Sequence, residues 1–133
     1  MLAKSGVNIS LDAILKAQHF PKIQKRVTDF YMLGWGVSTL DSHYVFSYLI
    51  ESKGSWNGTG YSNARVDEIT KLIASETDIP KRTALIDEAW TIVKSEMPYV
   101  PIHHQVLAWG MSDKIDIPIS SDDRLRPRFV VMK

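Results

Sequence analysis

Residues 29–36 read DFYMLGWG, a nearly unbroken apolar run that leads into the small residues of GVST at 36–39. Such a run is typical of a β-strand covered on both faces, as in a parallel sheet. Upstream, apolar and polar residues alternate over 7–13, which predicts a strand with one buried face. Between them, Pro21 suits the first turn of a short helix over 21–26. Strand, helix and strand in this order predict a βαβ unit with a right-handed crossover.

The chain after residue 40 predicts three helices. Asp41 can cap the first, and the loop-forming composition of 51–60 separates it from the second, which Ser62 or Asn63 can cap. Asp78 can cap the third, which Pro98 ends. The apolar residues expected on the buried faces of the last two helices are Val66, Ile69, Leu72, Ile73, Leu85, Ile86, Ala89, Trp90, Ile92 and Val93.

Two more strands are expected, over 99–107 and over 129–132, on either side of a polar stretch at 112–128. The whole pattern predicts an α/β fold with a parallel or mixed sheet flanked by helices. A chain of 133 residues is enough for one domain, with room for a tail.

Composition excludes several classes of function. The chain has no cysteine, so disulfide scaffolds, zinc fingers and thiol catalysis are excluded. Its net charge of +1 gives no strong field to attract nucleic acid or an anionic membrane surface. No stretch approaches the ~18 consecutive apolar residues of a membrane span. Gly34 and Gly36 lack the third glycine of a dinucleotide-binding loop, so no cofactor is expected.

The residue pattern also gives no indication of catalysis. The chain contains no G-x-S-x-G motif, and no pair of carboxylates is placed for glycoside hydrolysis. His103 and His104 are adjacent on an expected strand and would point to opposite faces, so they cannot share a metal ion there. We expect no metal site and no enzyme, although a hydrolase using His103 or His104 stays open as an alternative without a nucleophile.

Trp35 is the most informative residue for binding. It lies at the carboxyl end of the expected buried strand, the edge where open α/β sheets bind ligands. An aromatic wall beside the backbone amides and hydroxyls of residues 36–39 suits a flat or extended organic ligand. Asp41 is a second candidate for ligand contact. The alternative is that its side chain only caps the helix that follows.

An ordered series of motifs then points to a family. The series is DFYMLGWG (29–36), Asp41, Asn57, GYSN (60–63), VD (66–67), Asp78, Arg82, Leu85, Pro98 and VPI (100–102). With this spacing the chain resembles, over nearly its whole length, the C-terminal part of extracytoplasmic solute-binding proteins of ABC transporters, in the dipeptide and oligopeptide-binding family (family 5). The resemblance implies a type II periplasmic-binding-protein-like fold, a periplasmic location, and a two-lobed receptor that closes on a peptide or small solute and delivers it to a membrane permease.

The resemblance also implies a site. The loop after the Gly-Trp strand lines the ligand cleft in the family, so Trp35, Gly36 and Ser38 are the cleft candidates, with Asp41 nearby. Peptide-binding members carry an aspartate three residues after this tryptophan, where it pairs with the α-amino group of the peptide. Ser38 occupies that position here, so a ligand other than an ordinary peptide is an alternative.

Members of the family are several times longer than this chain. We therefore expect residues 1–108 to form most of a second lobe as a fragment, and residues 109–133 to form a tail that crosses the hinge back to an absent first lobe. Residues 129–132 would then be an unpaired apolar strand that is disordered, packs on a neighbouring molecule, or is exchanged into a dimer. The alternative is a stand-alone α/β ligand-binding or interaction module, complete at this length.

Overall fold

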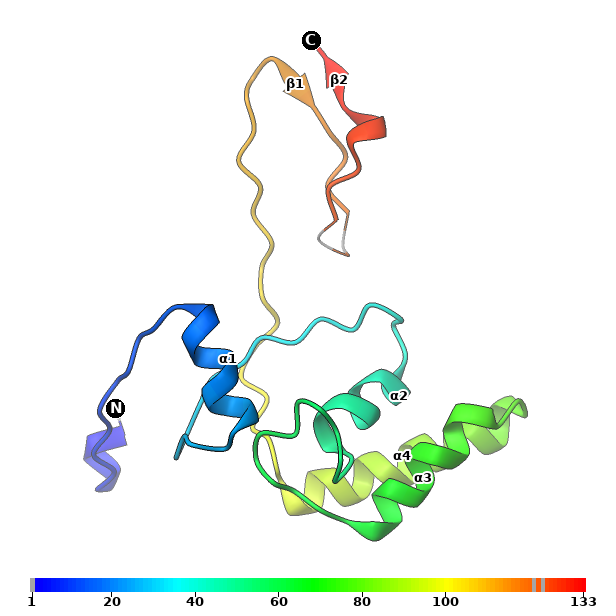
Figure 1. Ribbon diagram of the computed structural model, residues 1–133. Helices are drawn as coiled ribbons and strands as arrows, with labels where there is room; N and C mark the ends of the chain where they lie inside the picture. The colour runs from blue at the N-terminus through cyan, green and yellow to red at the C-terminus, as the bar shows by residue number, and fades with distance from the viewer. Residues whose placement is uncertain (1, 121, 123) are drawn as a thin grey trace.

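Three helical elements meet at the centre of the computed structural model, which describes residues 2–120, 122 and 124–133. They are α2 (Ser42–Val45), which continues into the π-helical turn η2 (Phe46–Ile50), and the antiparallel pair α3 (Ala64–Ser75) and α4 (Ile79–Glu96). In Figure 1, α3 and α4 lie side by side beneath α2. These helices position Trp35, through ring contacts with Tyr44 and Tyr48, and Asp41, which caps α2.

Short polar side chains begin the helices, as their positions in the sequence predict. The Asn63 side chain accepts hydrogen bonds from the backbone N–H groups of Arg65 and Val66, and that of Asp78 accepts one from Lys81. Each cap satisfies N–H groups that have no partner inside the helix. Of the two residues considered for the first of these caps, Asn63 is the one that serves. Ser62 instead accepts a hydrogen bond from the hydroxyl of Ser52.

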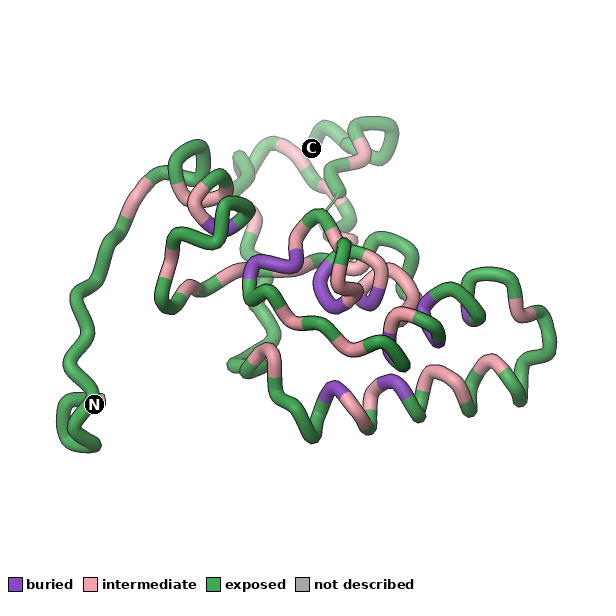
Figure 2. The backbone as a smooth tube through the Cα atoms, turned by 60° about the horizontal axis from the view of Figure 1, so that its bottom comes forward, coloured by how far each residue is buried: buried purple, intermediate pink, exposed green. Residues whose placement is uncertain are grey.

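The buried core lies where η2 meets α3 and α4 (Figure 2). Its members are Phe46, Leu49, Ile50, Val66, Ile69, Ile73, Ala89 and Val93. Phe46 is fully buried, and its ring centre lies 4.7 Å from that of Trp90. The prediction of Leu72 as a core residue is wrong, because its side chain is 42% exposed, beside a surface hollow that α3 shares with α4.

The loop of residues 51–60 folds around Asn57, which is 4% exposed. Its side-chain amide donates to the carbonyl oxygens of Glu51 and Tyr61, and its side-chain oxygen accepts from Thr59 and from the amide of Gly60. Every hydrogen-bonding position of this buried side chain is therefore used.

The first α-helix, α1 (Lys16–Gln24), begins five residues earlier than the pattern predicts, so Pro21 lies inside it. Pro21 is exposed, so its ring faces away from the protein, and the helix ends at Gln24, two residues before the predicted end. Ile23 anchors α1 and is fully buried. A Cβ atom on Gly58 would lie 2.5 Å from the Ile23 Cγ2 atom, so glycine allows the loop to approach α1 this closely. A short 3-10 helix, η1 (Leu2–Ser5), precedes it.

The expected βαβ unit and its parallel sheet are not formed in the part of the chain that the structure describes. Residues 7–13, 31–35 and 100–107 are neither helical nor turned, but they make no strand ladder with one another. The helix expected between the first two segments is present as α1. The structure therefore differs from the prediction in the pairing of the strands. A strand needs a partner for its backbone N–H and C=O groups, and an apolar run cannot specify which segment supplies that partner.

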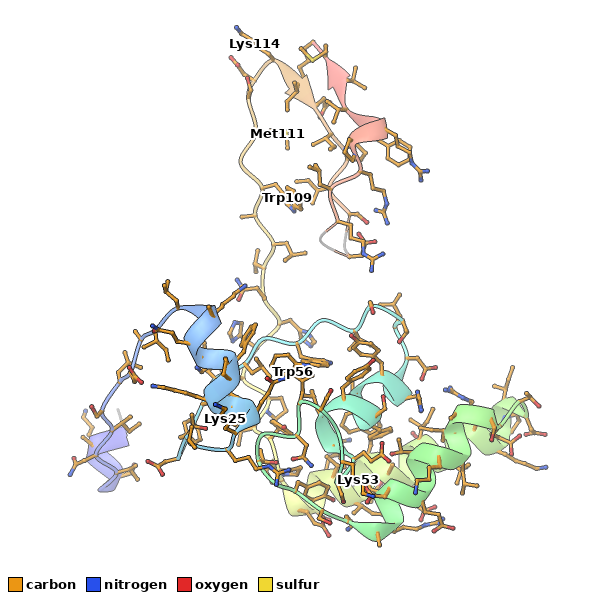
Figure 3. All side chains as sticks on the ribbon, viewed as in Figure 1. Lys25, Lys53, Trp56, Trp109, Met111 and Lys114 are labelled. Atoms are coloured by element: carbon orange, nitrogen blue, oxygen red, sulfur yellow. The ribbon has the colours of Figure 1, made fainter. Side chains whose placement is uncertain are left out.

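Residues 109–133 extend away from the helices and end in a small hairpin (Figures 1 and 3). Strand β1 (Ile115–Asp116) pairs antiparallel with β2 (Val131–Met132), and a 3-10 turn, η3 (Pro127–Phe129), precedes β2. The expectation of an unpaired strand over 129–132 is therefore wrong, because β1 supplies its partner within the same tail. Trp109 and Met111 lie on the connecting segment, well away from Trp56 among the helices (Figure 3).

The chain exposes an unusually large surface. Its accessible area is 10499 Å². A compact monomer of 15.1 kDa would expose about 7,100 Å². Much of the excess comes from the extended segments and the tail, where apolar side chains such as Leu11, Phe30 and Val106 are 79–89% exposed. Among the described residues, none of the helices combines the length and apolar character of a membrane span.

Candidate ligand-binding site

Trp35 joins a cluster of aromatic rings on top of the helical core. Its ring centre lies 5.9 Å from that of Tyr44, 6.2 Å from that of Tyr48 and 6.0 Å from that of Trp56. Phe20 of α1 extends the cluster, with its ring edge-on to Trp56 at 5.2 Å. Aromatic pairs at these separations stabilise one another, and the ring faces that remain open suit contact with planar or aliphatic groups.

The indole N–H of Trp35 is buried and finds no acceptor in the described part of the chain. A buried donor without a partner costs about 1–3 kcal/mol. Tyr48, beside it, is 40% exposed, so the aromatic cluster is open on one side. The cluster thus combines an open apolar wall with one unsatisfied donor.

Gly36 and Ser38 lie on the exposed segment that follows Trp35. Residues 37–40 form a turn in which the amide of Leu40 donates to the carbonyl oxygen of Val37 at 3.1 Å. Leu40 has a left-handed φ of 54° and is 92% exposed. A branched apolar residue in this conformation is strained. Nothing lies within 4 Å of a Cβ atom placed on Gly36, so the space beside the backbone is open there.

Asp41 serves the fold in two ways. One carboxylate oxygen accepts from the backbone N–H of His43 at 2.8 Å, which caps α2, and from the Arg82 guanidinium at 2.9 Å. Arg82 also donates to the carbonyl oxygen of Ile73, so it ties α2, α3 and α4 together. The hydrogen bond from Arg82, followed by that from His43, lowers the pKa of Asp41. The cap predicted as the alternative reading of Asp41 is confirmed.

A shallow hollow of about 510 Å³ lies beside Asp41, between the start of α2 and the junction of α3 with α4. Its walls are Thr39, Asp41, His43, Tyr44, Ser47, Tyr48, Ile73, Ala74, Ser75, Glu76, Thr77 and Arg82. Asp41 is the one sequence candidate among them. Trp35 reaches the same region only through its ring contacts with Tyr44 and Tyr48.

The structure therefore divides the four candidates into two groups. Trp35 belongs to the aromatic cluster, Asp41 belongs to the hollow, and Gly36 and Ser38 connect the two along an exposed segment. Sequence reasoning missed Trp56, and it named Arg82 only as part of the motif series and not as a partner of Asp41. These two residues come from a loop and a distant helix, so no local spacing indicates their place in the site. The spacing of Tyr44 and Tyr48 predicts that both lie on one face of a helix. That pattern predicts burial in the core and does not indicate a binding site.

Neither His103 nor His104 has a place in this site. Both are exposed on the extended segment after α4. Among residues 2–120, 122 and 124–133, no three side chains of the types that bind metal ions come together.

The ion pair of Asp41 should make stability depend on pH. Because the folded-state pKa is lowered, this contribution is present above the unfolded value of about 3.9 and is lost as pH falls through the folded value. An asparagine side chain can still cap α2, so Asp41→Asn should cost less than about 1 kcal/mol near neutral pH, while Asp41→Ala should cost about 1–2 kcal/mol. Urea unfolding between neutral and acidic pH measures both. A gap between wild type and Asp41→Asn that widens on acidification would contradict the assignment.

Comparison with known proteins identifies distant relatives. The chain is 24% identical to the oligopeptide-binding protein OppA of Bacillus subtilis over 110 residues, which are 83% of this chain and 20% of OppA. It is 33% identical to an uncharacterized lipoprotein of Mycobacterium tuberculosis over 69 residues, which are 52% of this chain and 12% of that protein. The similarity to a binding protein is distant. The chain thus spans a fifth or less of the length of these relatives.

No family model matches the chain. No solved structure matches it either.

Proposed function

We propose that this chain is part of a non-enzymatic solute-binding protein of an ABC importer and forms one wall of its ligand cleft. The observation that carries the proposal is the similarity to an oligopeptide-binding protein across 83% of the chain. The ordered motifs from residue 29 to residue 102 support it, since they resemble the same family. The lipoprotein relatives support an extracytoplasmic location.

The exposed surface supports a larger assembly. The chain exposes about 3,400 Å² more than a compact monomer of its mass, which exceeds the roughly 1,000–2,500 Å² that one partner contributes to a permanent interface. In the proposed protein, this chain supplies most of the second lobe of a type II periplasmic-binding-protein-like fold. A first lobe covers part of the open surface, and residues 109–133 cross to it.

The proposed mechanism is closure of two lobes on the ligand. Trp35 and its aromatic neighbours provide an apolar wall, and the segment at Gly36 and Ser38 offers backbone groups and a hydroxyl. A ligand that contacts both lobes favours the closed state, which the membrane permease then receives. One lobe alone makes only part of these contacts and binds weakly.

Ser38 determines which ligands fit. A free α-amino group in a closed cleft needs a carboxylate partner, because an unpaired buried ammonium is costly. The Asp41 carboxylate is already engaged with Arg82, so it is not available as a substitute. The proposed site therefore favours ligands without a free amino group at this position, such as blocked peptides or other small solutes.

Tetra-alanine and N-acetyl-tetra-alanine are suitable probes for the longer protein that carries this chain. Calorimetry should show that acetylation does not weaken binding to wild type, while Ser38→Asp improves binding of the free-amine peptide by about tenfold or more. Thr39→Asp is the matched control, since it adds the same charge one residue away. A wild type that strongly prefers the free amine, or that binds neither probe nor any of a panel of peptides and small solutes, would contradict the proposal.

A further inference from the structure

Tyr99 lies where the chain leaves the helices. It follows Pro98, which comes two residues after the end of α4, and its side chain is half-buried against the helical core. The residues after it, 100–108, are all exposed as the chain extends toward the tail (Figure 1). Tyr99 therefore anchors this end of the helical part.

The Tyr99 hydroxyl joins three segments of the chain. It accepts a hydrogen bond from the Tyr31 hydroxyl and shares its own proton between the carbonyl oxygens of Leu49 and Trp56, all at 3.3 Å. Leu49 lies in the last turn of η2, where carbonyl groups have no partner inside the helix. One hydroxyl, used as both acceptor and donor, thus links the segment before α2, the end of η2 and the loop after it.

Two of these three segments carry rings of the aromatic cluster. Trp35 lies on the same side of its segment as Tyr31, since half-buried and exposed residues alternate between them. The backbone of Trp56 is held on both sides, because its N–H donates to the carbonyl oxygen of Tyr48 at 3.0 Å and its own carbonyl accepts from Tyr99. The hydroxyl network therefore reaches both tryptophans, whose ring centres lie 6.0 Å apart.

The contact between the two tyrosines is enclosed. Burial raises the pKa of Tyr31, and its hydrogen bond with Tyr99 raises the pKa further, so this hydroxyl stays protonated and able to donate. A Cβ atom on Gly58 would lie 2.7 Å from the Tyr31 hydroxyl oxygen, so the loop packs directly against the same group. A hydrogen-bond network shielded in this way restricts the groups that it joins.

We propose that Tyr99 is a positioning residue of the ligand-binding site, whose hydroxyl holds Trp35 and Trp56 in the arrangement that forms the aromatic wall. This inference rests on the proposed function, because the wall matters for a ligand only where it lines the cleft. Rings that are held in place before binding lose less conformational freedom when the ligand arrives. Loss of the hydroxyl should therefore weaken binding without unfolding the chain.

Fluorine NMR of the chain labelled with fluorotryptophan tests the positioning without any ligand. Each of the four tryptophans gives a signal, and Trp35→Phe and Trp56→Phe assign the two of interest. In Tyr99→Phe these two signals should shift or broaden, while that of Trp109 in the tail stays in place. Tyr31→Phe removes only one of the three hydrogen bonds and should shift the Trp35 signal in the same direction. Wild-type positions of the Trp35 and Trp56 signals in Tyr99→Phe would overturn the proposal.

Tyr61→Phe is the matched control. The Tyr61 hydroxyl is also part of a half-buried side chain, but it donates to Glu96 at the end of α4, outside the aromatic cluster. Its removal should lower the urea midpoint about as much as Tyr99→Phe does and leave the two tryptophan signals unchanged. Equal displacement of these signals by both variants would reflect a general loss of stability and would also overturn the proposal.

Calorimetry of the longer protein that carries this chain, with N-acetyl-tetra-alanine as the probe, tests the effect on binding. Tyr99→Phe should weaken binding by about tenfold, and Tyr61→Phe should leave it unchanged. Wild-type affinity of Tyr99→Phe in spite of displaced signals would overturn both the role of Tyr99 in binding and the assignment of the aromatic wall to the cleft. Undisplaced signals would overturn the role of Tyr99 alone.

Discussion

Replacement of Phe46 by alanine should cost about 3–5 kcal/mol of unfolding free energy. Phe46 is fully buried at the centre of the cluster formed by η2, α3 and α4, and it packs against Trp90. Its removal leaves a cavity, and η2, α3 and α4 cannot easily move together to close it because they are packed against one another. Since small domains have a total stability of about 5–15 kcal/mol, the variant should lie close to unfolding at room temperature. Urea denaturation followed by far-UV circular dichroism measures the loss.

Phe129→Ala is the matched control for this substitution. Phe129 is 44% exposed in η3, away from the helical core, so its truncation should change stability by less than about 0.5 kcal/mol. Equal losses for the two variants would mean that the core does not lie where η2 meets α3 and α4.

Asn57→Ala should cost about 3 kcal/mol, because the buried amide satisfies several backbone groups at once. Its loss leaves the carbonyl oxygens of Glu51 and Tyr61 and the amide of Gly60 without their partner. The loop carries Trp56 into the aromatic cluster, so the substitution should also disturb the surroundings of Trp35. Chemical denaturation gives the stability, and near-UV circular dichroism reports on the aromatic cluster.

Two further variants sharpen this experiment. Asn8→Ala removes the same side chain from an exposed position and should leave stability unchanged. Asn57→Asp keeps the shape but removes both donors and buries a charge, so it should be at least as damaging as alanine. A tolerated Asn57→Asp would show that the amide donors do not hold the loop.

The helices could be predicted from the sequence because their signals are local. Asn63, Asp78 and Asp41 cap helices where their positions indicated, and the loop of 51–60 lies between the expected helices. The start of α1 was missed because Pro21 sits within it, a position that proline usually disfavours. The exposure of Leu72 could not be read from periodicity, since that depends on how far α4 covers α3.

The strands could not be predicted as a sheet for a different reason. An apolar run such as 29–35 indicates an extended conformation, and residues 31–35 are free of helix and turn, but pairing depends on segments far away in sequence. The type II periplasmic-binding-protein-like fold and the division at residue 109 therefore remain predictions. The candidate site shows the same limit, since the sequence indicated Trp35 and Asp41, while Trp56 and Arg82 reach them only through the tertiary fold.

The central claim is that Trp35, Gly36 and Ser38 line a ligand cleft, and amide hydrogen exchange of the longer protein carrying this chain tests it most directly. Exchange is compared with and without a saturating probe whose binding calorimetry has shown, such as N-acetyl-tetra-alanine. We predict that the ligand slows exchange at Gly36, Val37 and Ser38 by about tenfold or more, while the exposed residues 94–95 near the end of α4, outside the cleft candidates, are unchanged. Saturated binding that leaves the amides of Gly36, Val37 and Ser38 unprotected would contradict the account.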